Sequence, residues 1–100
     1  MAQPEQAAVE VFGHDVNAWI VRTPGRRFPG VVVQGDSLHA LYALAESVLG
    51  RVRAAGATDP ELAEEAEELR DLLWGRLQAY EGALRDHGLP LPYDRHAYPR

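Results

Sequence analysis

The chain contains no cysteine and no lysine, and its hydrophobic runs are short. Without cysteine there is no disulfide, no thiolate zinc site and no cysteine nucleophile. Without lysine there is no Schiff-base lysine and no Walker-type phosphate-binding lysine. No apolar run approaches the ~20 residues that span a bilayer. The N-terminal segment also lacks the basic start and apolar run of a signal peptide, so we expect a cytoplasmic protein.

Positive charge is also in short supply. Fifteen acidic side chains outweigh ten arginines and leave a net charge of −5 at neutral pH. Binding to nucleic acid or to an anionic membrane needs a positive field at the protein surface, so we expect neither as a partner. A length of 100 residues fits one small domain, and we predict that residues 1–100 form a single domain.

Signals typical of β-structure lie in the N-terminal third of the chain. Short runs rich in β-branched and aromatic residues predict strands at 9–12, 17–23 and 31–34. Residues 13–15, Gly-His-Asp, suit the turn of an antiparallel hairpin. The segment 24–30, framed by proline and glycine, separates the second strand from the third.

Two amphipathic helices follow. Ser37 is the predicted N-cap of a helix over 36–56, which Gly56 closes. The run Thr58-Asp59-Pro60-Glu61 predicts the start of a second helix over 59–88, because proline is favoured at the first helical position. Its apolar residues recur with an eleven-residue repeat, at Leu62, Ala66, Leu69, Leu73, Leu77, Tyr80 and Leu84. This stripe favours packing on the first helix over a parallel zipper, with a dimer seam as the alternative.

These elements predict an α+β fold, in which a three-stranded antiparallel sheet packs against two antiparallel helices. The chain divides into a sheet region at 7–35, helices at 36–56 and 59–88, and a Pro-rich extended tail at 89–100. We expect Leu89, Leu91 and Tyr93 of the tail to lie across the core.

Acidic side chains concentrate in the first half of the second helix. Between residues 59 and 71, seven acidic residues stand against one arginine. At 3-4 spacing, one side of the helix carries Glu61, Glu64, Glu65 and Glu68. One interpretation is a solvated face near the positive end of the helix dipole. The functional interpretation is a docking surface for a basic protein, such as a small toxin or nuclease.

In contrast to the acidic second helix, the loop before the third strand is rich in arginine. This cluster consists of Arg22, Arg26 and Arg27 together with Phe28. Arginine clamps carboxylate or phosphate bidentately, so a contact with an anion or a partner is the alternative to intramolecular pairing. On the second helix, Trp74 falls about 100° off the apolar stripe, where an exposed tryptophan would anchor an interface.

The sequence offers no catalytic constellation. The four histidines (His14, His39, His87 and His96) have no metal-ligand spacing, so we interpret them as surface residues and expect no metal. Ser37 lacks the G-x-S-x-G context of a nucleophile elbow. We therefore expect no enzyme and no cofactor.

Two resemblances are carried by the loop and the strand-to-helix junction. Arg26 to Leu38 match RxFPGVxxQGDSL, and this segment, with the ending Gly88–Tyr93, resembles an uncharacterised family of small, mostly actinobacterial proteins. Phe28-Pro29-Gly30 and Gln34–Leu38 are also similar to HicB-type antitoxins. That second resemblance implies a partial ribonuclease-H-like β-β-β-α fold and the neutralisation of a small basic ribonuclease toxin.

Together these features predict non-catalytic protein binding, in the manner of an antitoxin or immunity protein. One alternative is a homo-oligomeric structural protein, such as a homodimer formed through sheet edges or the flank of the second helix. The other is a module that responds to a small anionic ligand through the arginine cluster.

Overall fold

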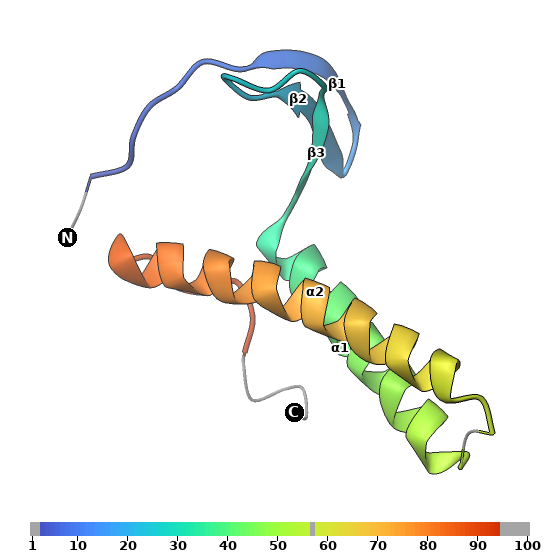
Figure 1. The fold of residues 1–100 in the computed structure, drawn as a ribbon. Coiled ribbons are helices and arrows are strands. Elements are labelled where there is room, and N and C mark those ends of the chain that lie inside the picture. The colour runs from blue at the N-terminus through green and yellow to red at the C-terminus, as the bar shows by residue number, and fades with distance from the viewer. Residues whose placement is uncertain (1–2, 57, 95–100) are drawn as a thin grey trace. The chain divides into compact units, whose positions relative to one another are not determined.

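The computed structural model describes residues 3–56 and 58–94, with three strands and two helices (Figure 1). It divides into two compact units, a sheet unit that ends at Gln34 and a helical unit that begins at Gly35. The α+β class with a three-stranded antiparallel sheet and two helices is confirmed. Packing of the sheet on the helices, and their union in one domain, stay predictions.

The sheet has the strand order β1-β2-β3 and is antiparallel throughout. Its strands are β1 (Glu10–Val16), β2 (Ala18–Arg22) and β3 (Gly30–Val33). The β2–β3 pairing is regular and places Trp19 opposite Val32. Its connecting loop turns through Gly25 at φ 80°, and the Arg26 amide donates to the Thr23 carbonyl at 3.1 Å. A positive φ is a conformation that glycine adopts without steric cost.

The predicted turn at 13–15 is wrong, because these residues belong to β1. The hairpin closes instead at Asn17, where Val16 pairs with Ala18. The pairing of β1 with β2 shifts register on either side of Gly13. Bulges of this kind absorb extra residues within a strand, and glycine commonly marks them.

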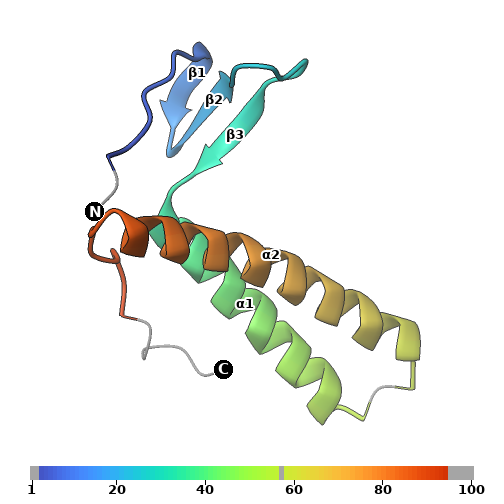
Figure 2. The ribbon, with the colours of Figure 1, turned by 60° about the vertical axis from the view of Figure 1, so that its left-hand side comes forward.

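The two helices are α1 (Gly35–Ala54) and α2 (Pro60–Asp86), which run antiparallel (Figure 2). At the start of α2, the Asp59 side chain accepts from the amides of Glu61 and Leu62, as an N-cap does. Gly56 and Gly88 follow the two helices with positive φ, as C′ glycines do. The N-cap prediction for Ser37 is wrong. The helix already begins at Gly35, and Asp36 accepts from the Ser37 amide at 2.9 Å.

The core of the helical unit lies between α1 and α2, where Tyr42, Ala45, Leu49 and Leu77 are buried. Gly35 packs so closely on the Tyr80 ring that a Cβ at Gly35 would overlap it. The predicted apolar stripe of α2 only partly coincides with this seam, because its members Leu62 and Leu69 are exposed. The residues of α2 that contact α1 or are buried beside it are Arg70, Trp74, Leu77 and Glu81.

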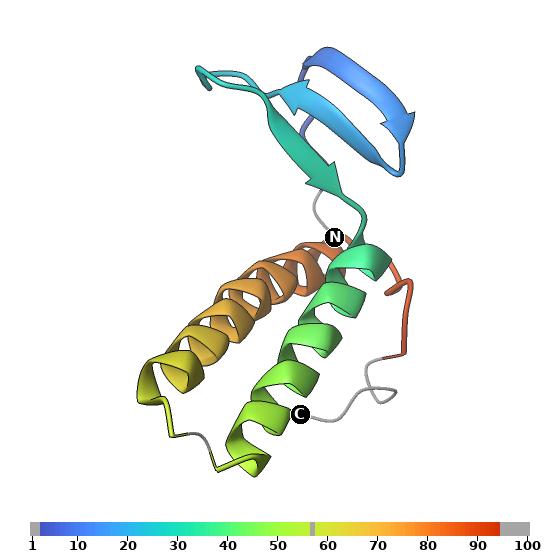
Figure 3. The same cartoon turned by 90° about the vertical axis from the view of Figure 1, so that its right-hand side faces the viewer.

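The described part of the tail lies against the helices (Figure 3). The Tyr93 ring stacks on His39 of α1 with the ring centroids 3.8 Å apart, and its hydroxyl donates to Glu81 of α2 at 2.6 Å. Leu91 is half-buried, whereas Leu89 is exposed, so the prediction for Leu89 is wrong. Residues 95–100 of the predicted tail lie outside the described residues. Among the described residues, neither helix is long and apolar enough to cross a lipid bilayer.

Candidate interaction surfaces

The acidic residues of α2 separate into two groups. Glu67 and Asp71 are engaged in ion pairs with Arg53 and Arg70. The four acids singled out from the sequence, Glu61, Glu64, Glu65 and Glu68, are all exposed. Their carboxylates form no ion pair within residues 3–56 and 58–94. The first half of α2 therefore carries an acidic surface that the described chain leaves uncompensated.

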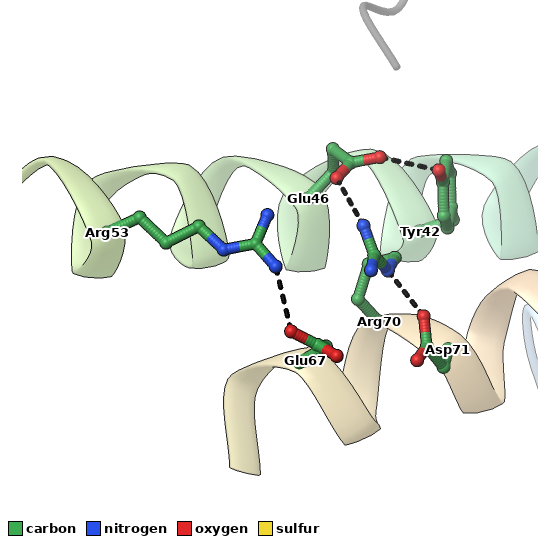
Figure 4. A network of polar contacts seen from close by, with 6 residues as sticks. All are labelled: Tyr42, Glu46, Arg53, Glu67, Arg70 and Asp71. Carbon is green, nitrogen blue, oxygen red and sulfur yellow. Dashed lines mark hydrogen bonds and ion pairs between the residues drawn. The ribbon is translucent and has the colours of Figure 1, made fainter. Parts of the chain in front are cut away.

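A polar network closes one side of the α1–α2 hairpin (Figure 4). Arg70 donates to Glu46 at 3.0 Å and to Asp71 at 2.6 Å, and the Tyr42 hydroxyl donates to Glu46 at 2.5 Å. The hydrogen bond to Asp71 is the largest influence on the pKa of Arg70 and raises it. Arg70 thus joins the two helices through charge-assisted hydrogen bonds.

Trp74 lies beside this network. Its ring is tilted against that of Tyr42 with the centroids 5.0 Å apart, and its side chain is half-buried. Trp74 therefore packs on the hairpin and leaves only part of its surface for a partner.

His39 and Glu81 form a buried polar cluster with Tyr93 of the tail. Both His39 and Glu81 are buried, which corrects the interpretation of His39 as a surface residue. Burial lowers the pKa of His39, and the nearby Glu81 carboxylate opposes this shift. Sequence periodicity could not find the cluster, because a tail residue completes it.

The arginine cluster gathers at the β2–β3 loop, but its members differ in what they contact. Arg22 donates to Glu10 at 2.7 Å and lies over the Phe12 ring, 5.5 Å from its centroid. Arg26 and Arg27 are exposed, and the Arg27 guanidinium lies 5.3 Å from the centroid of the Phe28 ring. Phe28 is 73 % exposed, the largest value among the exposed large hydrophobic side chains of the described residues. Arg26 and Phe28 also line a shallow depression of about 300 Å³.

Apolar side chains are exposed on both units. Among the described residues, five hydrophobic side chains are buried and fifteen large ones are exposed. The sheet exposes Trp19 and all three valines of β3. On the helical hairpin, the exposed aliphatic residues are Leu41, Leu44, Val48, Leu62, Leu69 and Leu72. A depression of about 590 Å³ between the helices is lined in part by Val48, Val52 and Leu62.

These surfaces contain no metal-binding cluster, since no three His, Cys, Asp or Glu side chains of the described part could hold an ion together.

Comparison with known proteins assigns a family without an activity. A family model described as "Family of unknown function (DUF6959)" matches residues 4–93, so the chain belongs to this family. No curated protein and no solved structure matches the chain.

Proposed function

We propose that this member of a family of unknown function is a non-catalytic protein-binding module of the cytoplasm, with an antitoxin- or immunity-like role toward a basic protein. The observation that carries the proposal is the acidic surface of α2, whose four exposed carboxylates form no ion pair in the described residues and lie beside exposed aliphatic side chains of the same helix. Contiguous apolar patches beyond a few hundred Å² are uncommon on monomeric proteins and mark sites of association.

The uncompensated acids of α2 indicate the charge of the partner. Glu61, Glu64 and Glu68 lie within about 60° of one another around the helix. All three are exposed, and Glu61 lies in the first turn of α2. A surface of one sign steers a partner of the opposite sign and raises the association rate. A basic toxin or nuclease fits this surface.

The resemblance to HicB-type antitoxins supports the same class of partner. Its residues lie at the β2–β3 loop, where Phe28 is exposed, and at the junction from β3 to α1. An exposed aromatic ring beside Arg26 and Arg27 has the composition of an interface anchor. The free edge of β3 offers backbone groups to a partner strand within the described sheet.

Affinity capture followed by binding of the purified partner tests the proposal. The tagged protein should retain a basic protein from a native lysate, and the purified pair should bind more weakly at high salt. Glu64→Gln/Glu68→Gln should weaken binding about tenfold, because two charge-assisted contacts are lost. The control Glu5→Gln/Asp86→Asn removes the same charge elsewhere and should bind like the wild type. Retention of no protein, or equal losses in both variants, would count against the proposal.

Anion binding at the arginine cluster is the second candidate. Arg26 and Arg27 form no ion pair within the described residues, and Arg26 lines the depression beside Phe28. Arg22 contributes less, because Glu10 already neutralises it. Millimolar phosphorylated ligands should raise the melting temperature of the wild type but not of Arg26→Ala/Arg27→Ala. No shift in either protein would dispose of this function.

A further inference from the structure

Helix α2 carries a second apolar-rich stripe, which shares Leu62 and Leu69 with the predicted eleven-residue stripe and lies outside the seam with α1. Its members follow one another in strict 3-4-3-4 steps: Leu62, Glu65, Leu69, Leu72, Arg76, Ala79 and Ala83. At 100° per residue they fall within an arc of about 100°. This arc is centred about 110° around the helix from Leu77, the most buried residue of α2. All seven stripe residues are exposed, with Leu62, Leu69 and Leu72 at 49 %, 52 % and 52 %.

The charges on the stripe are arranged in opposite halves of the helix. Glu65 lies in the N-terminal half and Arg76 in the C-terminal half, with Leu69 and Leu72 between them. Within the described residues, the Arg76 guanidinium donates to the Leu72 carbonyl of its own helix at 3.1 Å. Neither Glu65 nor Arg76 forms an ion pair within residues 3–56 and 58–94.

We propose that a second copy of this chain packs on the stripe, with the two α2 helices antiparallel about a two-fold axis. An axis between positions 70 and 71 places Leu69 opposite the partner's Leu72 and Glu65 opposite the partner's Arg76. The same register places Leu62 opposite the partner's Ala79, whose small side chain lets the backbones approach. Because the axis is two-fold, each of these contacts forms twice in the dimer. A parallel pair would instead place Glu65 against Glu65 and Arg76 against Arg76.

The exposed apolar surface is large enough for such a contact. The stripe from Leu62 to Ala79 is roughly 26 Å long at 1.5 Å per residue. Val48 of α1 extends the apolar surface, since it lines the same depression as Leu62. The exposed aliphatic residues form the apolar centre of the contact, toward the ~800 Å² of total surface that each partner contributes to a standard interface. Polar and small residues around the stripe supply the remainder.

The charge pattern distinguishes a second copy from a basic partner. A basic protein on this stripe would be repelled by Arg76, whereas a second copy pairs both Glu65 and Arg76 with opposite charges. Glu64 and Glu68 lie beyond the stripe on the side away from Leu77, so they stay exposed in the dimer, whereas Glu61 lies at the edge of the stripe. The dimer would cover Glu65 and the aliphatic stripe but would leave Glu64 and Glu68 of both copies accessible to a basic protein.

Sedimentation velocity and light scattering over a concentration series test the dimer. The wild type should reach twice the 11.1 kDa mass of one chain at tens of micromolar. Glu65→Arg and Arg76→Glu each place like charges at both symmetric contacts and should raise the dissociation constant at least tenfold. Glu65→Arg/Arg76→Glu restores both pairs with the wild-type net charge and should recover dimerisation. Glu64→Arg makes the same charge change off the stripe and should dimerise like the wild type.

The absence of cysteine allows the orientation to be measured. In Glu65→Cys/Arg76→Cys, mild oxidation of the antiparallel dimer should yield disulfides that join position 65 to position 76 of the other copy. Bonds joining 65 to 65 and 76 to 76 would overturn the antiparallel arrangement. A wild type that stays monomeric to hundreds of micromolar, or a double charge reversal without recovery, would overturn the dimer. If a stripe substitution instead abolished binding of a basic protein by a monomer, that protein would be the occupant.

Discussion

The two sides of the α1–α2 hairpin differ in how their side chains are satisfied. On one side, Arg70, Glu46 and Asp71 pair within the chain (Figure 4), and Trp74 packs on Tyr42. On the other side, Leu62, Leu69 and Val48 are about half exposed. A partner that binds the first side gains little free energy, because it would have to replace hydrogen bonds that already exist. A partner that binds the second side gains free energy, because the contact removes water from aliphatic groups.

Truncation of leucine should have its largest effect at the seam between the two sides. Leu77→Ala leaves a cavity in the core of the helical unit and should lower the free energy of unfolding by about 2–5 kcal/mol. Leu69→Ala, the same change on the exposed side, should lower it by no more than about 0.5 kcal/mol in the dissociated monomer. Urea denaturation followed by circular dichroism at low micromolar concentration measures both. Equal losses would remove the distinction between the seam and the stripe.

Removal of Arg70, the central residue of the polar network, should lower the free energy of unfolding by a smaller amount. Arg70→Met leaves the Glu46 carboxylate without its ion pair, and both side chains are largely screened from water, at 22 % and 18 % exposure. The free energy of unfolding should fall by about 1–3 kcal/mol. Arg53→Met is the matched control, since its pair with Glu67 is about half exposed and such pairs contribute about 0–1 kcal/mol. Equal effects of the two changes, measured by urea denaturation, would contradict a structural role for the network.

Acidification should destabilise the buried cluster of His39, Glu81 and Tyr93, with the smallest of the three effects. Burial lowers the pKa of His39 in the folded chain, so the unfolded chain takes up its proton first as pH falls. The stability contributed by neutral His39 is therefore present above its unfolded pKa of about 6.5 and is lost progressively below it. His39→Phe keeps a ring for Tyr93 and should reduce the loss of unfolding midpoint between pH 8 and pH 5.5. His14→Phe, a change at an exposed histidine, should keep the wild-type loss, and a similar loss in all three proteins would contradict the role of His39.

Local signals predicted the elements well where a single residue type sets the backbone. Asp59 with Pro60 marked the start of α2, and the glycines at 56 and 88 marked the helix ends. The turn expected at 13–15 failed, because strand pairing overrode the local turn preference and β1 absorbed the extra residues in bulges. Pairing partners lie far apart in the sequence, so local composition does not weigh them.

For the candidate surfaces, too, the sequence predicted the features that depend on single residues and missed those that depend on distant partners. The exposure of Glu61, Glu64 and Glu68 followed from charge alone, because isolated carboxylates are costly to bury. The pairing of Arg70 with Glu46 was missed, although Arg70 is the only arginine among the acidic residues of segment 59–71. A lone basic residue in an acidic helix was the available signal. Its partner became visible only when the two helices were placed side by side.

The missing cysteine and lysine, the acidic balance and the amphipathic helices were determined by the sequence itself, because composition and periodicity are properties of the chain. Which face of α2 contacts α1 was decided by the tertiary structure. Leu62 and Leu69 belong both to an eleven-residue stripe and to a heptad stripe, and these two periods differ by only a few degrees per residue. The packing of Arg70, Trp74 and Leu77 toward α1 shows that the seam lies to one side of the eleven-residue stripe and that the heptad stripe is left exposed.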